Sequence, residues 1–176
     1  LASEPRLILM DEPFSNLDHS LRFEMRTQLR HLLKENEVPC ILVTHDIEDV
    51  LSLADDAIIL KSGKIVQSGT AKDIYEKPTN EYIARLFGKI NVLTPEILKT
   101  VFGISFDKNQ LVRPDKIKIV NDENGKFKIV EQRFMGSYVE MLVSFGTINL
   151  VVHSNSEIDF TKLASVNIDH SHLIPI

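Results

Sequence analysis

The sequence of 176 residues lacks three features that would each assign it to a particular class of protein. It has a single cysteine, Cys40, so an intrachain disulfide is impossible and nothing supports an oxidising compartment. Its longest apolar runs are strand-sized, whereas a membrane-spanning helix needs about 18 apolar residues. Its net charge of −5 comes from interleaved acidic and basic residues, which gives no electrostatic argument for nucleic acid or an anionic membrane as partner.

The chain also lacks an initiator methionine and a signal peptide. It opens at Leu1 and continues directly into Ala2-Ser3-Glu4-Pro5-Arg6. We interpret this as an internal start, so the chain is expected to be part of a longer protein. Cys40 itself lies in the apolar run Cys40-Ile41-Leu42-Val43, which is typical of a small buried side chain rather than a reactive thiol.

The first half alternates short apolar runs with amphipathic segments. The expected strands are at 7–10, 40–44 and 57–60, the last turning at Ser62-Gly63 into 65–66. The expected helices are at 19–35, with Asp18 as N-cap, at 47–54, and in two short segments that follow a capping box of Thr70 and Asp73. This order of strands and helices predicts an α/β fold with a parallel sheet and right-handed crossovers.

The second half has a different texture, with short strands separated by turn signals. A helix is expected at 95–102, and strands at 116–120, 127–130, 138–144, 148–153 and 166–176. Phe145-Gly146-Thr147 is a hairpin signal between two of these strands. Short strands at this spacing predict a small β-barrel. We therefore expect two domains, at 1–90 and 91–176.

Polar side chains follow two of the predicted strands at the point where each strand ends. Asp11 and Glu12 follow the first strand, and His45 follows the second. Open α/β sheets bind ligands at this edge, so we expect His45 to lie near Glu12. Two adjacent carboxylates are costly without a cation, and Mg²⁺ prefers oxygen ligands. Singly, the acid pair also fits a solvated strand edge and the histidine a structural role, but their combination favours a site.

These residues together resemble the ATP-binding subunits of ABC transporters. Leu7–Glu12 is similar to their Walker B strand, Ser15–Asp18 to their D-loop, and His45 to their switch histidine. Leu1–Arg6 resembles the end of the helix that follows the ABC signature. Asn16 departs from the family pattern, in which Ala or Gly is commoner. The resemblance implies that residues 1–90 are the C-terminal portion of a RecA-like P-loop NTPase domain with a parallel sheet.

The resemblance also implies ATP hydrolysis with Mg²⁺, and a role for each residue. Asp11 would hold the metal ion, and Glu12 would be the general base that polarises the attacking water. His45 would contact the γ-phosphate and hold that water in place. Asp18 would act across a dimer of two ATPase subunits, which is compatible with its also being a helix cap. The implied catalytic residues are thus Glu12 and His45, and the implied cofactor-binding residues are Asp11, Asp18 and His45.

The phosphate-binding half of such a site is missing from the sequence. None of the seven glycines belongs to a Gly-x-x-x-x-Gly-Lys-Ser/Thr loop, whose backbone and lysine would hold the phosphates of ATP. No Ser-Gly-Gly-Gln signature is present either. In the family, both motifs precede the Walker B strand. We therefore predict that this chain alone neither binds ATP or Mg²⁺ tightly nor hydrolyses ATP.

Short motifs in the second half resemble the TOBE domain, a small OB-like barrel that is attached to the ATPase subunits of many importers. They lie at Tyr82–Asn91, Leu111–Asp115 and Phe134–Ser137. OB-like barrels of this kind bind oligosaccharides or oxyanions, but no cluster of residues here specifies a ligand. His170 and His172 would share one face of a strand, and His153 is a further histidine, yet a metal site is disfavoured because no third ligand is apparent.

The leading hypothesis is the energising subunit of a bacterial importer, peripheral to the cytoplasmic face of the inner membrane. The substrate classes implied are polyamines, ferric iron, oxyanions and sugars. The implied partners are membrane permease subunits, a second ATPase subunit in a homodimer and, indirectly, a solute-binding protein, with no nucleic acid. One alternative is a non-transport ABC ATPase, although the coiled-coil insertions or basic linkers typical of that class are absent. Another is a ligand-sensing or dimerising TOBE module with exposed hairpin edges.

Overall fold

The computed structural model describes residues 5–159 and 163–176. The helix end expected at Leu1–Arg6 lies largely outside these residues. The chain divides into two compact units, Leu1–Tyr75 and Glu76–Ile176. The domain boundary expected at 90/91 stays a prediction. It was placed where the sequence pattern changes, which is a different criterion from the one that separates these two units. Among the described residues, no helix is long and apolar enough to cross a membrane.

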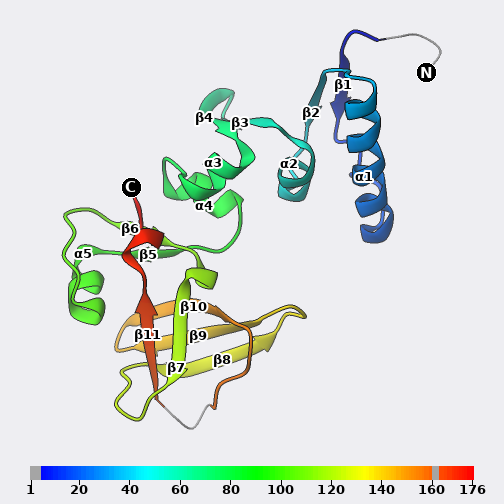
Figure 1. Ribbon diagram of the computed structural model, residues 1–176. Coiled ribbons are helices and arrows are strands. Elements are labelled where there is room, and N and C mark those ends of the chain that lie inside the picture. The colour runs from blue at the N-terminus through cyan, green and yellow to red at the C-terminus, as the bar shows by residue number, and fades with distance from the viewer. Residues whose placement is uncertain (1–4, 160–162) are drawn as a thin grey trace. The chain divides into compact units, whose positions relative to one another are not determined.

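The N-terminal unit contains a parallel strand pair, two helices and a hairpin (Figure 1). Its strands are β1 (Ile8–Asp11), β2 (Cys40–Val43), β3 (Asp56–Lys61) and β4 (Lys64–Thr70). Its helices are α1 (His19–Glu35) and α2 (Ile47–Leu53), and α3 (Ala71–Glu76) begins in it. β1 pairs in parallel with β2, with Ile8 opposite Cys40 and Asp11 opposite Val43. The predicted parallel pairing of these two strands is confirmed, and it aligns their carboxyl ends.

Helix starts occur where the capping residues predict them. The backbone N–H of Leu21 donates to Oδ1 of Asp18 over 2.9 Å, and α1 has the predicted bounds. The backbone N–H of Asp73 donates to Oγ1 of Thr70 over 3.0 Å at the start of α3. Each cap satisfies a backbone donor that the first helical turn leaves without a partner. Local chemistry therefore fixes where the chain turns from loop into helix.

The third predicted strand does not extend the parallel sheet. β3 instead pairs antiparallel with β4. Ser62 and Gly63 join the two strands with φ angles of 50° and 73°, and two left-handed residues in succession form the tight turn that suits strand twist. Because the chain reverses at once, the neighbouring segment supplies the hydrogen bonds of β3. The prediction of a third parallel strand is therefore wrong for the described residues.

One face of the β1–β2 pair is open to solvent. Leu9, Ile41 and Val43 are 69%, 55% and 56% exposed, whereas the alternate residues of both strands are half-buried. Continuous apolar runs are typical of strands that are covered on both faces. Within the described part of the chain, only one face of this pair is covered.

The C-terminal unit is built mainly from short antiparallel strands (Figure 1). Its strands are β5 (Asn91–Leu93), β6 (Gln110–Val112), β7 (Ile117–Asn121), β8 (Lys128–Phe134), β9 (Val139–Phe145), β10 (Ile148–Ser154), β11 (Ala164–Ile168) and β12 (Ile174–Pro175). Its helices are α4 (Glu81–Leu86) and α5 (Pro95–Ile97), which continues as a π-helical turn, Leu98–Phe102. The sheet orders are β10-β9-β8, β11-β7 and β12-β6-β5. The strands predicted around the Phe145–Thr147 hairpin are confirmed, whereas β5 and β6 were not predicted.

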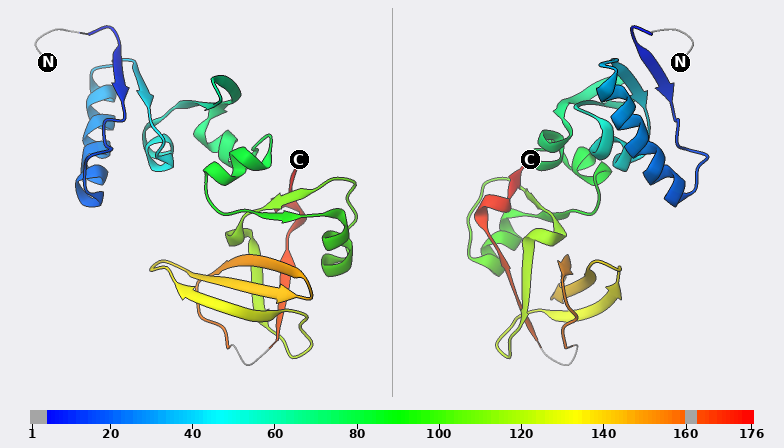
Figure 2. Two further views of the ribbon diagram at one scale, coloured as in Figure 1. Left: turned by 180° about the vertical axis from the view of Figure 1, so that it is seen from behind. Right: turned by 45° about the vertical axis from the view of Figure 1, so that its right-hand side comes forward.

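A hydrophobic core lies between the first two of these sheets, which face each other in Figure 2. Its buried members include residues from or next to the strands of both sheets: Ile117, Phe127, Met141, Val143, Leu150, Val152 and Ala164. An isolated bridge between Phe127 and Ala164 links the two sheets. The architecture is thus a small β domain with its strands distributed over three sheets, and a smaller buried cluster of Ala84, Ile90 and Leu111 lies apart from this core.

Two residues of the TOBE-like motifs tie this unit together. The side chain of Asn91 makes two hydrogen bonds of 2.8 Å with the backbone N–H and C=O of Val151. Nη1 of Arg113 donates to the carbonyl of Ala84 over 2.8 Å. Both polar side chains are buried, and buried polar groups are costly unless they are paired. The hydrogen bonds that these two side chains make inside the unit therefore account for their presence in the motifs.

The last predicted strand, 166–176, is interrupted in the structure. β11 ends at Ile168, a 3₁₀ turn spans His170–His172, and the two-residue β12 pairs with β6. The backbone N–H of Ser171 donates to Oδ1 of Asp169 over 2.9 Å, so a local side-chain cap replaces the sheet ladder at this point. The expectation that His170 and His172 share a strand face is wrong.

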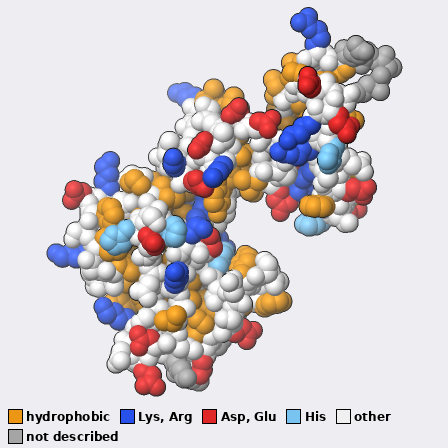
Figure 3. Space-filling model, viewed as in Figure 1, with side chains coloured by type: hydrophobic (Ala, Val, Ile, Leu, Met, Phe, Trp, Pro, Cys, Tyr) orange, Lys and Arg blue, Asp and Glu red, His pale blue; other side chains and the backbone are white. Residues whose placement is uncertain are grey.

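The mixed charge of the sequence persists on the surface. On the face drawn in Figure 3, Lys and Arg side chains are interspersed with Asp and Glu side chains. Such mixing is ordinary for a globular protein and creates no extended field of one sign.

Replacing Gly125 with alanine is expected to destabilise the C-terminal unit by roughly 1–3 kcal/mol, the usual cost of overpacking. A Cβ at this position would lie 2.4 Å from the backbone carbonyl carbon of Ala164, so one of the two chain segments would have to move. Thermal unfolding followed by circular dichroism measures the effect. Lys126→Ala at the neighbouring exposed position is the control, and equal melting temperatures for both variants would contradict the expectation.

Candidate functional site

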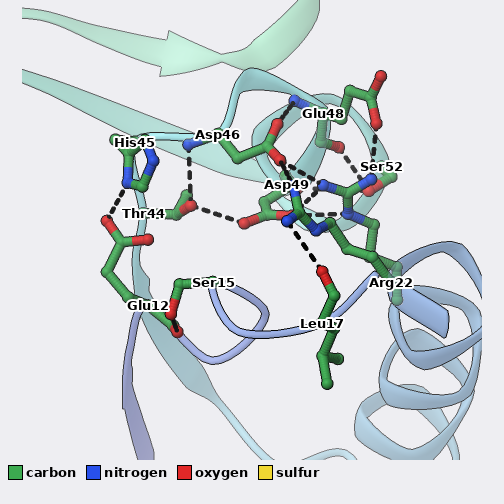
Figure 4. A network of polar contacts seen from close by, with 11 residues as sticks. Glu12, Ser15, Leu17, Arg22, Thr44, His45, Asp46, Glu48, Asp49 and Ser52 are labelled. Atoms are coloured by element: carbon green, nitrogen blue, oxygen red, sulfur yellow. Dashed lines mark hydrogen bonds and ion pairs between the residues drawn. The ribbon is translucent and has the colours of Figure 1, made fainter. Parts of the chain in front are cut away.

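The predicted contact between Glu12 and His45 is present at the aligned ends of β1 and β2. Nδ1 of His45 lies 2.7 Å from Oε1 of Glu12, although 33 positions separate them in the sequence. Figure 4 shows the two side chains pointing toward one another from neighbouring strand ends. The Glu12 side chain is 34% exposed and the imidazole 82% exposed, so a ligand can reach both groups. The expectation that these residues meet is confirmed, while their catalytic roles stay a prediction.

The backbone of Glu12 adopts an unusual conformation at the end of β1. Its N–H still donates to the carbonyl of Val43 over 2.9 Å, as in the strand ladder. Its φ angle is 47°, in the left-handed region that L-residues rarely occupy. The hydroxyl and the backbone N–H of Ser15 then donate to the carbonyl of Glu12 over 2.9 and 3.2 Å. Strained residues of this kind concentrate at functional sites.

The Glu12 carboxylate strengthens the tendency of the imidazole to hold a proton. A carboxylate only accepts hydrogen bonds, so the proton between the two side chains belongs to Nδ1 of His45. The hydrogen bond and the negative charge of Glu12 raise the pKa of His45 above its ordinary value, while desolvation opposes the shift slightly. This arrangement leaves Nε2 of the ring available to another partner.

An NMR titration of this chain should give His45 a pKa above the ordinary value of about 6.5, and Glu12→Gln should lower it. A raised folded-state pKa means that protonation favours the folded form. The stabilisation is complete below the pKa of unfolded histidine and is lost as the pH rises through the folded-state pKa. His45→Gln identifies the resonance. An unchanged His45 titration in Glu12→Gln would show that the contact is absent in solution.

Asp11, the predicted metal ligand, is solvent-exposed at the last position of β1, directly before Glu12. Among the described residues, no group of three or more His, Cys, Asp or Glu side chains could hold a metal ion. Mg²⁺ that is bound with a nucleotide commonly uses one or two protein carboxylates and takes its other oxygens from phosphates and water. The single carboxylate of Asp11 suits such a role.

Asp18, the fourth predicted site residue, lies away from the Glu12–His45 contact along the chain. Its carboxylate caps α1 through Leu21, and its carbonyl accepts from the backbone N–H of Arg22 over 2.9 Å. The structural reading of Asp18 as a helix cap is confirmed. Its action across a dimer stays a prediction.

A buried network of charges behind the contact was not predicted. Arg26 on α1 donates from Nε to Oδ1 of Asp49 over 2.6 Å, from Nη2 to Oδ2 of Asp46 over 2.8 Å, and from Nη1 to Oε2 of Glu48 over 2.7 Å. Arg26 and Asp49 are 6% and 2% exposed. Charged residues are rarely so buried unless they are paired. Nothing in the sequence indicated this network, because the arginines and glutamates of the 19–35 helix were expected on the face opposite its apolar residues.

Asp46 lies directly after His45 and takes part in this network. Burial opposes ionisation of its carboxyl group, but the backbone N–H of Glu48 and the charges of Arg26 and Arg22 outweigh it and lower the pKa. Nη1 of Arg22 lies 2.9 Å from Oδ2 of Asp46. The start of α2 is therefore held to α1 by ionised groups at neutral pH.

The C-terminal unit has a smaller polar cluster around Glu140. Nζ of Lys89 donates to Oε1 of Glu140 over 2.6 Å, and Nε2 of His153 lies 3.4 Å from Oε2. The bond from Lys89 is the main cause of a lowered pKa for Glu140. The ring of His153 stacks on Tyr138 with a centroid separation of 4.1 Å. His153 is thus occupied by protein contacts.

Comparison with known proteins identifies relatives along almost the whole chain, although no family model matches. The spermidine/putrescine import ATP-binding protein PotA of Clostridium acetobutylicum is 33% identical over 175 residues, which cover 90% of this chain and 50% of that protein. PotA of Clostridium novyi is 32% identical over 185 residues, covering 96% and 53%. PotA of Mycoplasmopsis synoviae is 32% identical over 199 residues, covering 99% and 43%. The chain spans about half the length of the curated relatives that it matches.

A solved structure, cbiO1 from Clostridium perfringens, is also similar. It is described as part of the ABC transporter complex cbiONQ. It shares 30% sequence identity with this chain, and the match covers 41% of this chain and 29% of that chain with a TM-score of 0.39.

Proposed function

This chain is homologous to the PotA type of ABC transporter ATP-binding subunit, and from this premise we propose that the whole protein hydrolyses ATP to drive an importer. The observation that carries the proposal is the Glu12–His45 contact, next to Asp11, in a chain that is homologous to these subunits. A carboxylate and an imidazole at one strand edge can orient a water molecule against a phosphoryl group, which needs positioning and charge stabilisation more than covalent chemistry.

In this proposal each group has one task. Glu12 accepts a proton from the attacking water, and His45 holds that water and contacts the γ-phosphate. Asp11 holds Mg²⁺, which neutralises charge on the phosphate oxygens when it is bound. Asp18 acts at the interface with a second copy of the protein.

We propose polyamines as the substrate class, which narrows the four classes expected from the sequence. The support is the function of the three relatives described above, each of which is a spermidine/putrescine import ATP-binding protein. The partners in this proposal are permease subunits, a second ATPase subunit and, indirectly, a solute-binding protein. The subunit would be peripheral to the membrane on its cytoplasmic side.

The test uses the whole protein and this chain in parallel. The whole protein with Mg²⁺ is expected to hydrolyse ATP, whereas this chain alone is expected to show no turnover, because it has no glycine-rich phosphate loop. Cells that carry the complete transporter should take up radiolabelled spermidine or putrescine. ATP turnover by this chain alone, or uptake that does not require the protein, would contradict the proposal.

A further inference from the structure

We propose that Asp49 is a positioning residue for His45, acting through Thr44 and Arg26. Its buried carboxylate fixes the segment between β2 and α2, and this segment carries His45. The inference rests on the proposed function, because a position for His45 has chemical meaning only if it faces a reacting phosphate. Asp49 itself is not expected to touch the nucleotide.

One hydroxyl, that of Thr44, holds the backbone on both sides of His45. Oγ1 of Thr44 donates to Oδ2 of Asp49 over 2.6 Å. The same Oγ1 accepts from the backbone N–H of Asp46 over 3.0 Å. Thr44 and Asp46 are the two chain neighbours of His45, so the hydroxyl closes a short loop around it (Figure 4). Asp49 orients this hydroxyl by accepting its proton.

Asp49 is itself bound to α1 through Arg26. Its Oδ1 accepts from Nε of Arg26 over 2.6 Å, so its two oxygens serve two different elements. Nη2 of Arg22, one turn earlier on α1, donates to the carbonyl of Leu17 over 3.1 Å. Leu17 belongs to the loop that follows Glu12. The charge network therefore connects the segments that carry Glu12 and His45 by a path that does not use their direct contact.

The position of the His45 ring depends more on the buried contacts of Asp49 than on the exposed contact with Glu12. The Glu12–His45 contact is open to water, with the imidazole 82% exposed, and exposed ion pairs contribute little to stability. Such a pair cannot by itself keep a flexible ring in one place. The Asp49 carboxylate is buried with charged and hydroxyl partners, and buried polar networks of this kind rigidify their surroundings. The buried network therefore determines where His45 stands.

The kinetic test compares two substitutions at position 44 in the whole protein. Thr44→Val removes the hydroxyl and leaves the Arg26–Asp49 pair intact, so the variant should fold. We expect kcat for ATP hydrolysis to fall about tenfold or more, as is usual when an orienting partner is lost, with KM for ATP unchanged. Thr44→Ser, which restores the hydroxyl, should recover most of kcat. Asp49→Ala should lower kcat at least as far.

Thr27→Val is the matched control, because it removes a threonine hydroxyl at an exposed position of α1, where Oγ1 donates to the carbonyl of Phe23 over 3.1 Å. It should leave kcat close to that of the original protein. A merely structural role for Thr44 and Asp49 predicts a lower melting temperature with an unchanged kcat per folded molecule. That outcome, or a serine variant as impaired as the valine variant, overturns the inference.

An NMR measurement on this chain separates this inference from the proposed function. When Thr44 is kept, Glu12→Gln should shift the ring resonances of His45. In Thr44→Val, the same replacement should have no such effect, because the imidazole is no longer held beside Glu12. Loss of this response in a protein without ATPase activity would support the positioning role and reject the function. An undiminished response would reject the positioning role whatever the activity.

Discussion

We expect Glu12→Gln in the whole protein to lower kcat for ATP hydrolysis by roughly 10²–10⁴-fold, the range in which a general base contributes. The amide has nearly the shape of the carboxyl group but cannot accept a proton from water. Because the backbone at position 12 keeps its left-handed conformation with either side chain, the fold is expected to survive. ATP affinity should be retained, since the phosphate-binding groups lie elsewhere in the proposed site. Steady-state ATPase assays with Mg²⁺ and nucleotide-binding titrations measure the two effects separately.

Glu35→Gln is the matched control for this prediction. Glu35 is an exposed acid at the last position of α1, and the substitution removes the same charge without touching the site. Its kcat should equal that of the original protein. A Glu12→Gln protein with full turnover would show that the general base is another group, and the assignment of Glu12 would then be wrong. Equal losses in both variants would indicate an effect of net charge.

Arg26→Leu is expected to destabilise the N-terminal unit by roughly 3–5 kcal/mol, the usual cost of removing one partner from a buried ion pair. The carboxylate of Asp49 is 2% exposed and would be left buried without its cation. Amide hydrogen exchange of α1 measures the free energy of local opening where the change occurs. Faster exchange throughout α1 and α2 is the expected observation.

Two further variants make this expectation specific. In Arg26→Leu/Asp49→Leu both charges are absent, so much of the lost stability should return, as a double-mutant cycle requires for a coupled pair. Arg30→Leu removes an arginine one turn later, whose Nη1 donates to the carbonyl of Ser52, and should cost only about 1 kcal/mol. If Arg26→Leu and Arg30→Leu were equally mild, the buried pair would not be a source of stability.

The parts of the fold that depend on local chemistry were predictable from the sequence. The bounds of α1 and the cap at Asp18 follow from side chains within a few residues of each other. The approach of Glu12 to His45 was also predictable, because it needs only two parallel strands that end together. In each case a short rule of backbone geometry was sufficient.

Where two local signals compete, or where distant partners decide the outcome, the sequence alone was not sufficient. The antiparallel choice of β3 depended on a tight turn competing with an existing sheet. The interruption after Ile168 depended on Asp169 capping its own backbone, which an apolar pattern does not reveal. Arg26 and Asp49 are ordinary charged residues in the sequence, and only the packing of α1 beside α2 makes them a buried pair.

The positive φ angle of Glu12 has a consequence for how this protein can change. A left-handed conformation costs an L-residue about 1–2 kcal/mol, whereas glycine adopts it freely. Selection for a more robust fold alone would therefore favour glycine at position 12, and selection for turnover would favour the acid. Laboratory evolution under heat, with no demand for transport, should discard this glutamate early, and variants recovered under both pressures should keep it and gain their robustness at other positions.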